Sequence, residues 1–231
     1  HGLPPPGPPL QDFDMRYVKT AVMAVGFLLG LAHSALAQDE AGELWFNPAV
    51  ETSLDDRTSI ELETAQRLRS DPRDDTYFAR LWLKRQDSRG RDWNVGVEHR
   101  WNGPDEREVR LLQQVGYDWG PLEFRTRLEQ RFVNIDPRTG WRLRQRIGAT
   151  FPLTDDEDGW ALTGDAEVFV TLRNTEPGGQ TGVTGLRTFV GFERGFGRYD
   201  VSLGYLRQQD IRDDAEDRVG HAPFVGVTVS F

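Results

Sequence analysis

Two alternating runs joined by a turn, at residues 121–151, constrain the fold more than any other part of this sequence. In both runs apolar residues recur at alternate positions, and charged residues, chiefly arginines, stand between them. Successive side chains of a β-strand point to opposite faces, so each run has one apolar face and one ionic face. Residues 134–139 have the composition of a turn. The ionic face must either meet water or be enclosed with its charges paired, because unpaired charges are too costly to bury.

The same alternation continues along the chain and predicts further strands. No helical period and no internal repeat persists. Many of the expected strands are longer than the roughly 5–6 residues of an average soluble strand and reach the roughly 9–11 that a membrane-spanning strand needs. The expected strands lie at 44–54, 58–69, 76–86, 91–101, 108–119, 121–133, 140–151, 160–173, 185–195, 198–210 and 221–231.

Aromatic residues near the ends of the apolar faces favour a membrane barrel over a soluble one. Membrane barrels carry aromatic girdles at both interfaces, with short periplasmic turns and longer outer loops. Residues 118–121 and 195–198 are tight connections, whereas 174–184 and 211–219 are long and polar. The aromatic residues placed in this way are Trp93, Trp101, Tyr117, Trp119, Trp141, Phe151, Tyr199 and Tyr205.

These patterns predict an all-β, antiparallel, up-and-down transmembrane β-barrel with a charged lumen. Single-chain bacterial barrels have even strand numbers. Eleven candidate segments would place the N-terminus outside, so we expect that 44–54 is not a full wall strand. The sequence therefore predicts about ten strands, with twelve as the alternative.

The start of the chain has the three parts of a secretory signal peptide. These parts are, after Met15, the bases Arg16 and Lys19, the apolar run 21–32 and the small-residue sequence 35–37. We therefore expect a signal peptide at 15–37 and an outer-membrane β-barrel domain at 38–231. Residues 1–14 are proline-rich and are interpreted as non-native or mis-assigned upstream sequence.

The last strand ends on Phe231, after Val225, Val227 and Val229 on one face. A terminal aromatic on such a strand resembles the signal that Gram-negative outer-membrane barrels present to their assembly machinery. We expect the chain to contact that machinery through this strand, and outer-membrane lipid and lipopolysaccharide through its apolar face.

Several short sequences resemble one family of Gram-negative outer-membrane β-barrels, which is catalogued only as a domain of unknown function. The resemblance covers nearly all of the chain after the signal peptide and implies an outer-membrane barrel, with no activity or catalytic residue to carry over. The sequences that carry it are Glu43-Leu44-Trp45, 128–132, 141–146, 166–169 and Gly204-Tyr205-Leu206.

Charged residues of the two central runs and the strand after them form the candidate lumen network. In an antiparallel hairpin Glu129 would lie near Arg142 and Arg144, and carboxylates must separate arginines that would otherwise repel. Paired charges would plug a small barrel, whereas an arginine track would attract anions through a narrow passage. The candidate residues are Glu123, Arg125, Arg127, Glu129, Arg131, Arg142, Arg144, Arg146 and Glu167.

Composition excludes several other functions. A net charge of −9 argues against nucleic-acid binding, and the absence of cysteine excludes thiolate metal sites. The acidic loops 155–159 and 213–217 lack the ligand spacing of a calcium loop. Only His99 and His221 follow the signal peptide, and the sequence places no serine beside His221. We therefore expect no enzyme, no cofactor and no metal site.

The predicted role is structural, or that of a narrow porin-like pore that prefers anions, in the bacterial outer membrane. The alternative from another class is a soluble periplasmic β-barrel that binds an apolar ligand, since a soluble barrel turns its apolar face inward with the same period. A less favoured alternative is an outer-membrane enzyme that modifies lipid.

Overall fold

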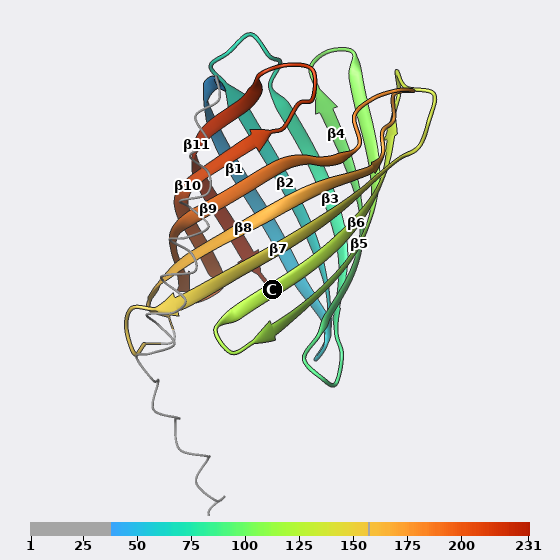
Figure 1. The fold of residues 1–231 in the computed structure, drawn as a ribbon. Helices are drawn as coiled ribbons and strands as arrows, with labels where there is room; N and C mark the ends of the chain where they lie inside the picture. The colour runs from blue at the N-terminus through green and yellow to red at the C-terminus, as the bar shows by residue number, and fades with distance from the viewer. Residues whose placement is uncertain (1–37, 157) are drawn as a thin grey trace, which may run out of the picture. The chain divides into compact units, whose positions relative to one another are not determined.

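The computed structural model describes residues 38–156 and 158–231, which form a closed β-barrel (Figure 1). The expected upstream segment 1–14 and signal peptide 15–37 lie outside the described residues. Within the described ranges, no helix has the length and hydropathy to cross a membrane. The strands are β1 (Gln38–Asp55), β2 (Thr58–Arg69), β3 (Thr76–Gln86), β4 (Asp92–Asn102), β5 (Glu106–Trp119), β6 (Leu122–Val133), β7 (Gly140–Pro152), β8 (Trp160–Arg173), β9 (Gly182–Phe196), β10 (Tyr199–Asp210) and β11 (Asp217–Ser230).

The all-β barrel is confirmed, but the predicted strand number of ten or twelve is wrong. The described residues form eleven strands, and segment 44–54 is part of a full wall strand, β1. β1 pairs with β2 on one side and with β11 on the other, so it closes the barrel. The even-number rule misled the prediction because it presumes that the first and last strands are antiparallel.

The purely antiparallel topology is also wrong at one seam. Strands that reverse direction at every connection leave the first and the eleventh pointing the same way. β1 and β11 therefore pair in parallel, from Gln38 opposite Asp217 to Glu51 opposite Ser230, while the other neighbouring strands are antiparallel. The barrel is thus mixed rather than antiparallel throughout.

The two ends of the barrel differ in their connections. We call the end that carries 56–57, 120–121 and 197–198 the short-turn end, and the end that carries 70–75, 134–139, 174–181 and 211–216 the long-loop end. The expected alternation of short and long connections has exceptions, because 153–159 is long at the short-turn end and 103–105 is short at the long-loop end. Phe231 lies at the short-turn end, where its N–H donates to the Glu51 carbonyl at 3.0 Å.

Apolar side chains cover the outer face of the wall. Leu81, in the middle of β3, is 48% exposed, and Trp93 on β4 is 50% exposed. The neighbouring residues of the same strands, Arg80 and Asn94, are buried in the lumen. The alternation therefore turns its apolar face outward and its charged face inward. Other outward apolar residues are Leu44, Val50, Leu62, Val95, Val97, Leu111, Phe192, Leu203 and Tyr205.

Glycines let aromatic rings lie flat against the inner wall. A Cβ added at Gly96 would come within 2.5 Å of the Trp82 ring on the next strand, and one at Gly191 or Gly204 would meet the Phe189 ring within 2.7 Å. A glycine in a strand often marks such a close approach. The lumen is consequently filled by rings as well as by charges.

Candidate functional site

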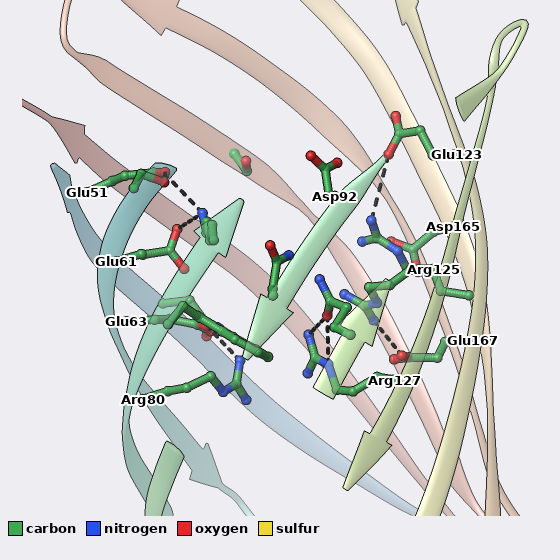
Figure 2. A pocket seen from close by; sticks show the side chains of 18 of the residues that line it. Glu51, Glu61, Glu63, Arg80, Asp92, Glu123, Arg125, Arg127, Asp165 and Glu167 are labelled. Atoms are coloured by element: carbon green, nitrogen blue, oxygen red, sulfur yellow. Dashed lines mark hydrogen bonds and ion pairs between the residues drawn. The ribbon is translucent and has the colours of Figure 1, made fainter. Parts of the chain in front are cut away.

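A cavity of about 880 Å³ occupies the part of the lumen toward the short-turn end (Figure 2). It extends from the β1–β2 turn, where Asp56 and Arg57 line it, to Arg67 and Arg144 deeper inside. Inward-facing side chains of the strands form its walls, because every second residue of each strand points into the lumen.

Carboxylates on facing walls surround the mouth of the cavity. Figure 2 shows Glu51 and Glu61 on one wall and Glu123 and Asp165 on the other. Lys84 Nζ lies 3.1 Å from Glu51 Oε2 and 2.5 Å from Glu61 Oε2. The carboxylates of Glu123 and Asp165 both lie near one guanidinium, that of Arg146, at 3.7 and 3.6 Å. These mouth carboxylates therefore each have a basic partner.

The turn at 87–91 beside the mouth is organised around one carboxylate. Asp87 accepts hydrogen bonds from the backbone N–H of Arg91 at 3.1 Å and of Arg89 at 2.8 Å, and from Arg91 Nε at 2.8 Å. These donors hold the pKa of the Asp87 carboxyl well below its usual range. The turn therefore carries an ionised aspartate over the ordinary pH range.

Below the cavity, buried charges form a continuous network that we call the ionic layer. It consists of four arginines and four glutamates, and further arginines at its edges pair with the same glutamates, for example Arg131 with Glu108 and Arg142 with Glu129. Glu98 and Glu108 are 0% exposed and Glu129 is 1% exposed. The members of the ionic layer are Arg80, Glu98, Arg100, Glu108, Arg110, Glu129, Arg144 and Glu167.

The first part of the ionic layer links β3 to β5. Arg80 pairs with Glu98 through Nε at 2.8 Å, and Glu98 Oε1 lies 2.9 Å from Arg100 and 3.3 Å from Arg110. Arg110 also pairs with Glu108 at 2.5 Å. Glu98 thus contacts three arginines on three strands.

The second part continues from β5 to β9. Glu129 lies 3.8 Å from Arg110 and 2.9 Å from Arg144. Arg144 Nε donates to Glu167 at 3.0 Å, and Glu167 lies 3.7 Å from Arg187 on β9. The network therefore runs from strand to strand around the inner wall, from β3 to β9. Its members Arg80, Arg144 and Glu167 line the inner end of the cavity.

Burial in this layer is costly unless every charge keeps its partner. Taking an ion out of water costs several kcal/mol after relaxation, and only close, hydrogen-bonded partners compensate for this. The short Arg–Glu contacts supply that compensation, and the planar guanidinium suits two-point pairing with a carboxylate. Pairing of each buried glutamate with close arginines thus offsets the cost of enclosing it.

The structure brings most of the nine predicted network residues together. Glu129 accepts from Arg142 Nε at 2.9 Å and pairs with Arg144, and Glu167 pairs with Arg144 and with Arg125 at 2.5 Å. The others lie elsewhere. Arg131 pairs with Glu108, Arg127 donates only to Gln114, and Glu123 and Arg146 lie at the mouth of the cavity.

The charges on β3 to β5 were not among the predicted network residues. Five of the eight members of the ionic layer lie on these strands and are as deeply buried as the predicted ones: Arg80, Glu98, Arg100, Glu108 and Arg110. Their alternation with apolar residues was a sufficient signal, since Glu108 and Arg110 flank Val109 just as Arg127 and Glu129 flank Leu128.

An apolar sector of the lumen was also missed. Trp45, Leu206 and Ala222 form a buried cluster, against which Phe189 and Phe224 pack. The signal in the sequence was adjacent apolar pairs, such as Phe189-Val190 and Phe224-Val225, which break the alternation and show that both faces of those strands are apolar. β1, β9 and β11 therefore contribute rings to the lumen and β10 contributes Leu206, while the charges concentrate on β2 to β9.

The histidines lie on the outer face rather than in the cavity. His99 stacks on Trp101 with ring centroids 4.3 Å apart, and His221 Nδ1 hydrogen-bonds the Tyr205 hydroxyl. Among the described residues, no group of His, Asp or Glu side chains is arranged to hold a metal ion, and this includes the described parts of the acidic loops 155–159 and 213–217.

Comparisons with known proteins agree in giving no activity. The family model described as "Protein of unknown function (DUF2490)" matches residues 42–219. An uncharacterized protein of Methylorubrum extorquens is 34% identical over 107 residues, which are 44% of this chain and 47% of that protein. The chain thus spans about half the length of this curated relative. No solved structure matches the chain.

Proposed function

This chain belongs to the family described as a protein of unknown function (DUF2490), and we propose that it is an outer-membrane β-barrel whose lumen is closed by the ionic layer. Membership confirms the expected resemblance to a family of unknown function. The family description names no cellular location, so the location in the outer membrane is part of this proposal. The role we propose is structural and ligand-binding rather than that of an open passage.

The observation that carries the proposal is the inverted distribution of side chains. Soluble monomers rarely expose contiguous apolar patches larger than a few hundred Å². Here exposed leucines, valines and aromatic residues cover the outer wall, while Glu98, Glu108 and Glu129 are enclosed. Hydrocarbon on the outside and charge on the inside is the arrangement expected of a barrel in lipid.

Three further features support this placement. The strands are long enough to cross a bilayer, since the shortest have 11 residues. Trp93 and Tyr117 lie toward the short-turn end of the outer face and Trp101 toward the long-loop end, as in aromatic girdles. The connections 56–57, 120–121 and 197–198 share one end, and short turns of membrane barrels face the periplasm, so we propose that the short-turn end faces the periplasm.

Replacing Leu81 by arginine tests whether lipid covers the outer wall. Leu81 lies at the middle of β3, where an arginine in hydrocarbon costs about 2–4 kcal/mol, falling to about 0–1 near an interface. We expect Leu81→Arg to lower the free energy of unfolding in lipid vesicles by that larger amount. The matched control is Leu54→Arg, an outward leucine at the strand end that is 57% exposed.

The two leucine variants separate the membrane and soluble alternatives. Exposed leucines of a soluble barrel would tolerate arginine within about 0.5 kcal/mol at both positions. Equal, small effects at Leu81 and Leu54, or recovery of the native protein from the periplasmic fraction without detergent, would contradict the membrane placement and favour the soluble alternative.

The orientation can be tested with single cysteines, because the chain has none of its own. Ala215 lies in the exposed 211–216 loop at the long-loop end, and Asp56 lies in the β1–β2 turn at the short-turn end. We expect a membrane-impermeant maleimide to label Ala215→Cys on intact cells and Asp56→Cys only after the outer membrane is opened. The reverse pattern would invert the proposed orientation.

We propose no catalytic role for this barrel. The histidines on which a lipid-modifying enzyme would depend face outward and contact aromatic rings, His99 on Trp101 and His221 on Tyr205. A hydrolase needs a nucleophile within hydrogen-bond reach of such a base. Neither histidine has a serine hydroxyl as a hydrogen-bond partner among the described residues.

A further inference from the structure

We propose that the cavity binds a small organic anion, a carboxylate or phosphate monoester that carries an aromatic group, with its charged end between Arg67 and Arg187. This inference goes beyond the membrane placement and does not depend on it, because the residues concerned all face the lumen.

Arg67 is a buried cation without a compensating partner. It lines the cavity and is 9% exposed, and its Nε has no hydrogen-bond partner among the described residues. No carboxylate of the described chain forms an ion pair with it. Its guanidinium instead lies over the Trp45 ring, with Cζ 3.7 Å from the ring centroid. A cation–π contact offsets only part of the cost of burying a charge.

Arg187 brings a second cation to the same ring. Its Cζ lies 4.7 Å from the Trp45 centroid, so Trp45 holds both guanidinium groups near one another. Arg187 donates to the amide oxygen of Gln208 at 3.1 and 2.6 Å. Its nearest carboxylate, Glu167 at 3.7 Å, is already shared with Arg144 and Arg125. The pair Arg67 and Arg187 therefore carries surplus positive charge.

Over the whole lining of the cavity the charges balance, with ten carboxylates and ten basic side chains, so the positive surplus is local. The mouth carboxylates Glu51, Glu61, Glu123 and Asp165 each lie within 3.7 Å of a lysine or arginine nitrogen. Arg127, in contrast, also lines the cavity and donates only to the neutral side chain of Gln114. Lining carboxylates that form no ion pair among the described residues, such as Asp92 and Glu193, lie toward the mouth, whereas Arg67 and Arg127 lie deeper, so the inner end of the cavity is positive. An anion there would satisfy donors that the chain leaves free, and guanidinium groups bind carboxylate and phosphate with two parallel hydrogen bonds.

The wall beside these arginines is aromatic. Phe189, two residues toward the mouth from Arg187 on β9, packs edge-to-face on Phe224 with centroids 5.2 Å apart, and Leu206 lies beside them. All three side chains line the cavity. A ligand whose charged end meets Arg67 and Arg187 would place its next atoms against this wall. The volume of about 880 Å³ lies within the range of roughly 300–1,000 Å³ that is usual for small-molecule sites.

The test is isothermal titration calorimetry on the refolded full-length barrel. The probes are benzoate, phenyl phosphate, inorganic phosphate and the neutral benzyl alcohol. We expect benzoate and phenyl phosphate to bind at one site per chain, inorganic phosphate at least about tenfold more weakly because it forgoes the aromatic wall, and benzyl alcohol not measurably.

Two variants and a matched control assign the binding to the arginines. Arg67→Gln and Arg187→Gln each remove one cation, and each should weaken benzoate binding about tenfold or more. Arg69→Gln is the control, because Arg69 lies on the same strand and the same lumen face as Arg67, pairs with Glu43 at 3.3 Å and does not line the cavity. It should leave the affinity unchanged.

The unfolding midpoint provides a second readout that does not rely on calorimetry. Arg67→Gln should fold at least as stably as the parent chain, since it removes a buried charge that has no partner. Benzoate should raise the midpoint of the parent chain and leave that of Arg67→Gln unchanged. Absence of binding by both aromatic anions, equal binding of benzyl alcohol, or an affinity that both arginine variants retain would overturn the proposal. Unchanged membrane insertion in the same samples would show that the barrel is folded, so that such a failure concerns the anion site and not the proposed membrane placement.

Discussion

Glutamine in place of Glu129 is expected to lower the free energy of unfolding by about 3–5 kcal/mol, the usual cost of breaking a buried ion pair from one side. Glu129 is 1% exposed, pairs with Arg142 at 2.6 Å and with Arg144 at 2.9 Å, and lies 3.8 Å from Arg110. Without its negative charge these arginines keep their desolvation cost and lose a shared partner. Urea unfolding of the barrel in vesicles, followed by the heat-dependent gel shift, measures the effect.

Glu123→Gln is the matched control for this prediction. The Glu123 side chain is 41% exposed, and its nearest cation, Arg146, lies 3.7 Å away. Solvent-exposed pairs contribute about 0–1 kcal/mol, so this variant should unfold close to the parent midpoint. If Glu129→Gln and Glu123→Gln unfolded alike, the ionic layer would not be the stabilising network that we describe.

Opening the ionic layer is expected to turn a silent barrel into a conducting one. If the buried side chains of this layer close the lumen, as we propose, the parent protein should pass no resolvable current in a planar bilayer. Glu129→Ala combined with Arg144→Ala removes two large side chains of opposite charge that lie 2.9 Å apart, and should produce discrete current steps. Because Arg125, Arg127 and Arg187 then border the opening, the current should favour anions.

Arg146→Ala is the comparison for the conductance measurement. Arg146 lines the cavity near its mouth, on the short-turn side of the ionic layer, so its removal should leave the lumen closed. A steady current through the parent protein would instead favour the narrow anion-preferring pore, which is the second candidate function. Silence of the double variant in a folded barrel would show that other side chains also close the lumen.

The bounds of the strands could be predicted from the sequence alone. β2, β3 and β8 begin and end where the alternation begins and ends, because a period of two residues is a local property of the chain. Strands such as β9 and β11 begin a few residues earlier than predicted. Their first residues pair with a neighbouring strand of the barrel, β11 with β1 for example. Such pairing cannot be recognised from the local sequence pattern.

The partners of each charge depended on more than alternation. Glu129 could be placed near Arg142 and Arg144 because all three belong to neighbouring strands joined by a short turn. Arg131 instead pairs with Glu108 on the preceding strand, and Glu98 reaches Arg80 on one side and Arg110 on the other. Which residues form each ion pair depends on the register between the strands and on the closure of the barrel, which brings the side chains together in the lumen.

By itself the sequence determined that the chain is a series of long strands, each with one apolar and one ionic face, because successive side chains of an extended backbone must alternate. Only the tertiary structure decided that eleven strands close through a parallel seam between β1 and β11, and that closure turns the ionic face inward. It also placed Arg67 and Arg187 against the same tryptophan, Trp45 from a third strand, β1. Residues far apart in the chain meet in the lumen, and their proximity is a property of the closed barrel.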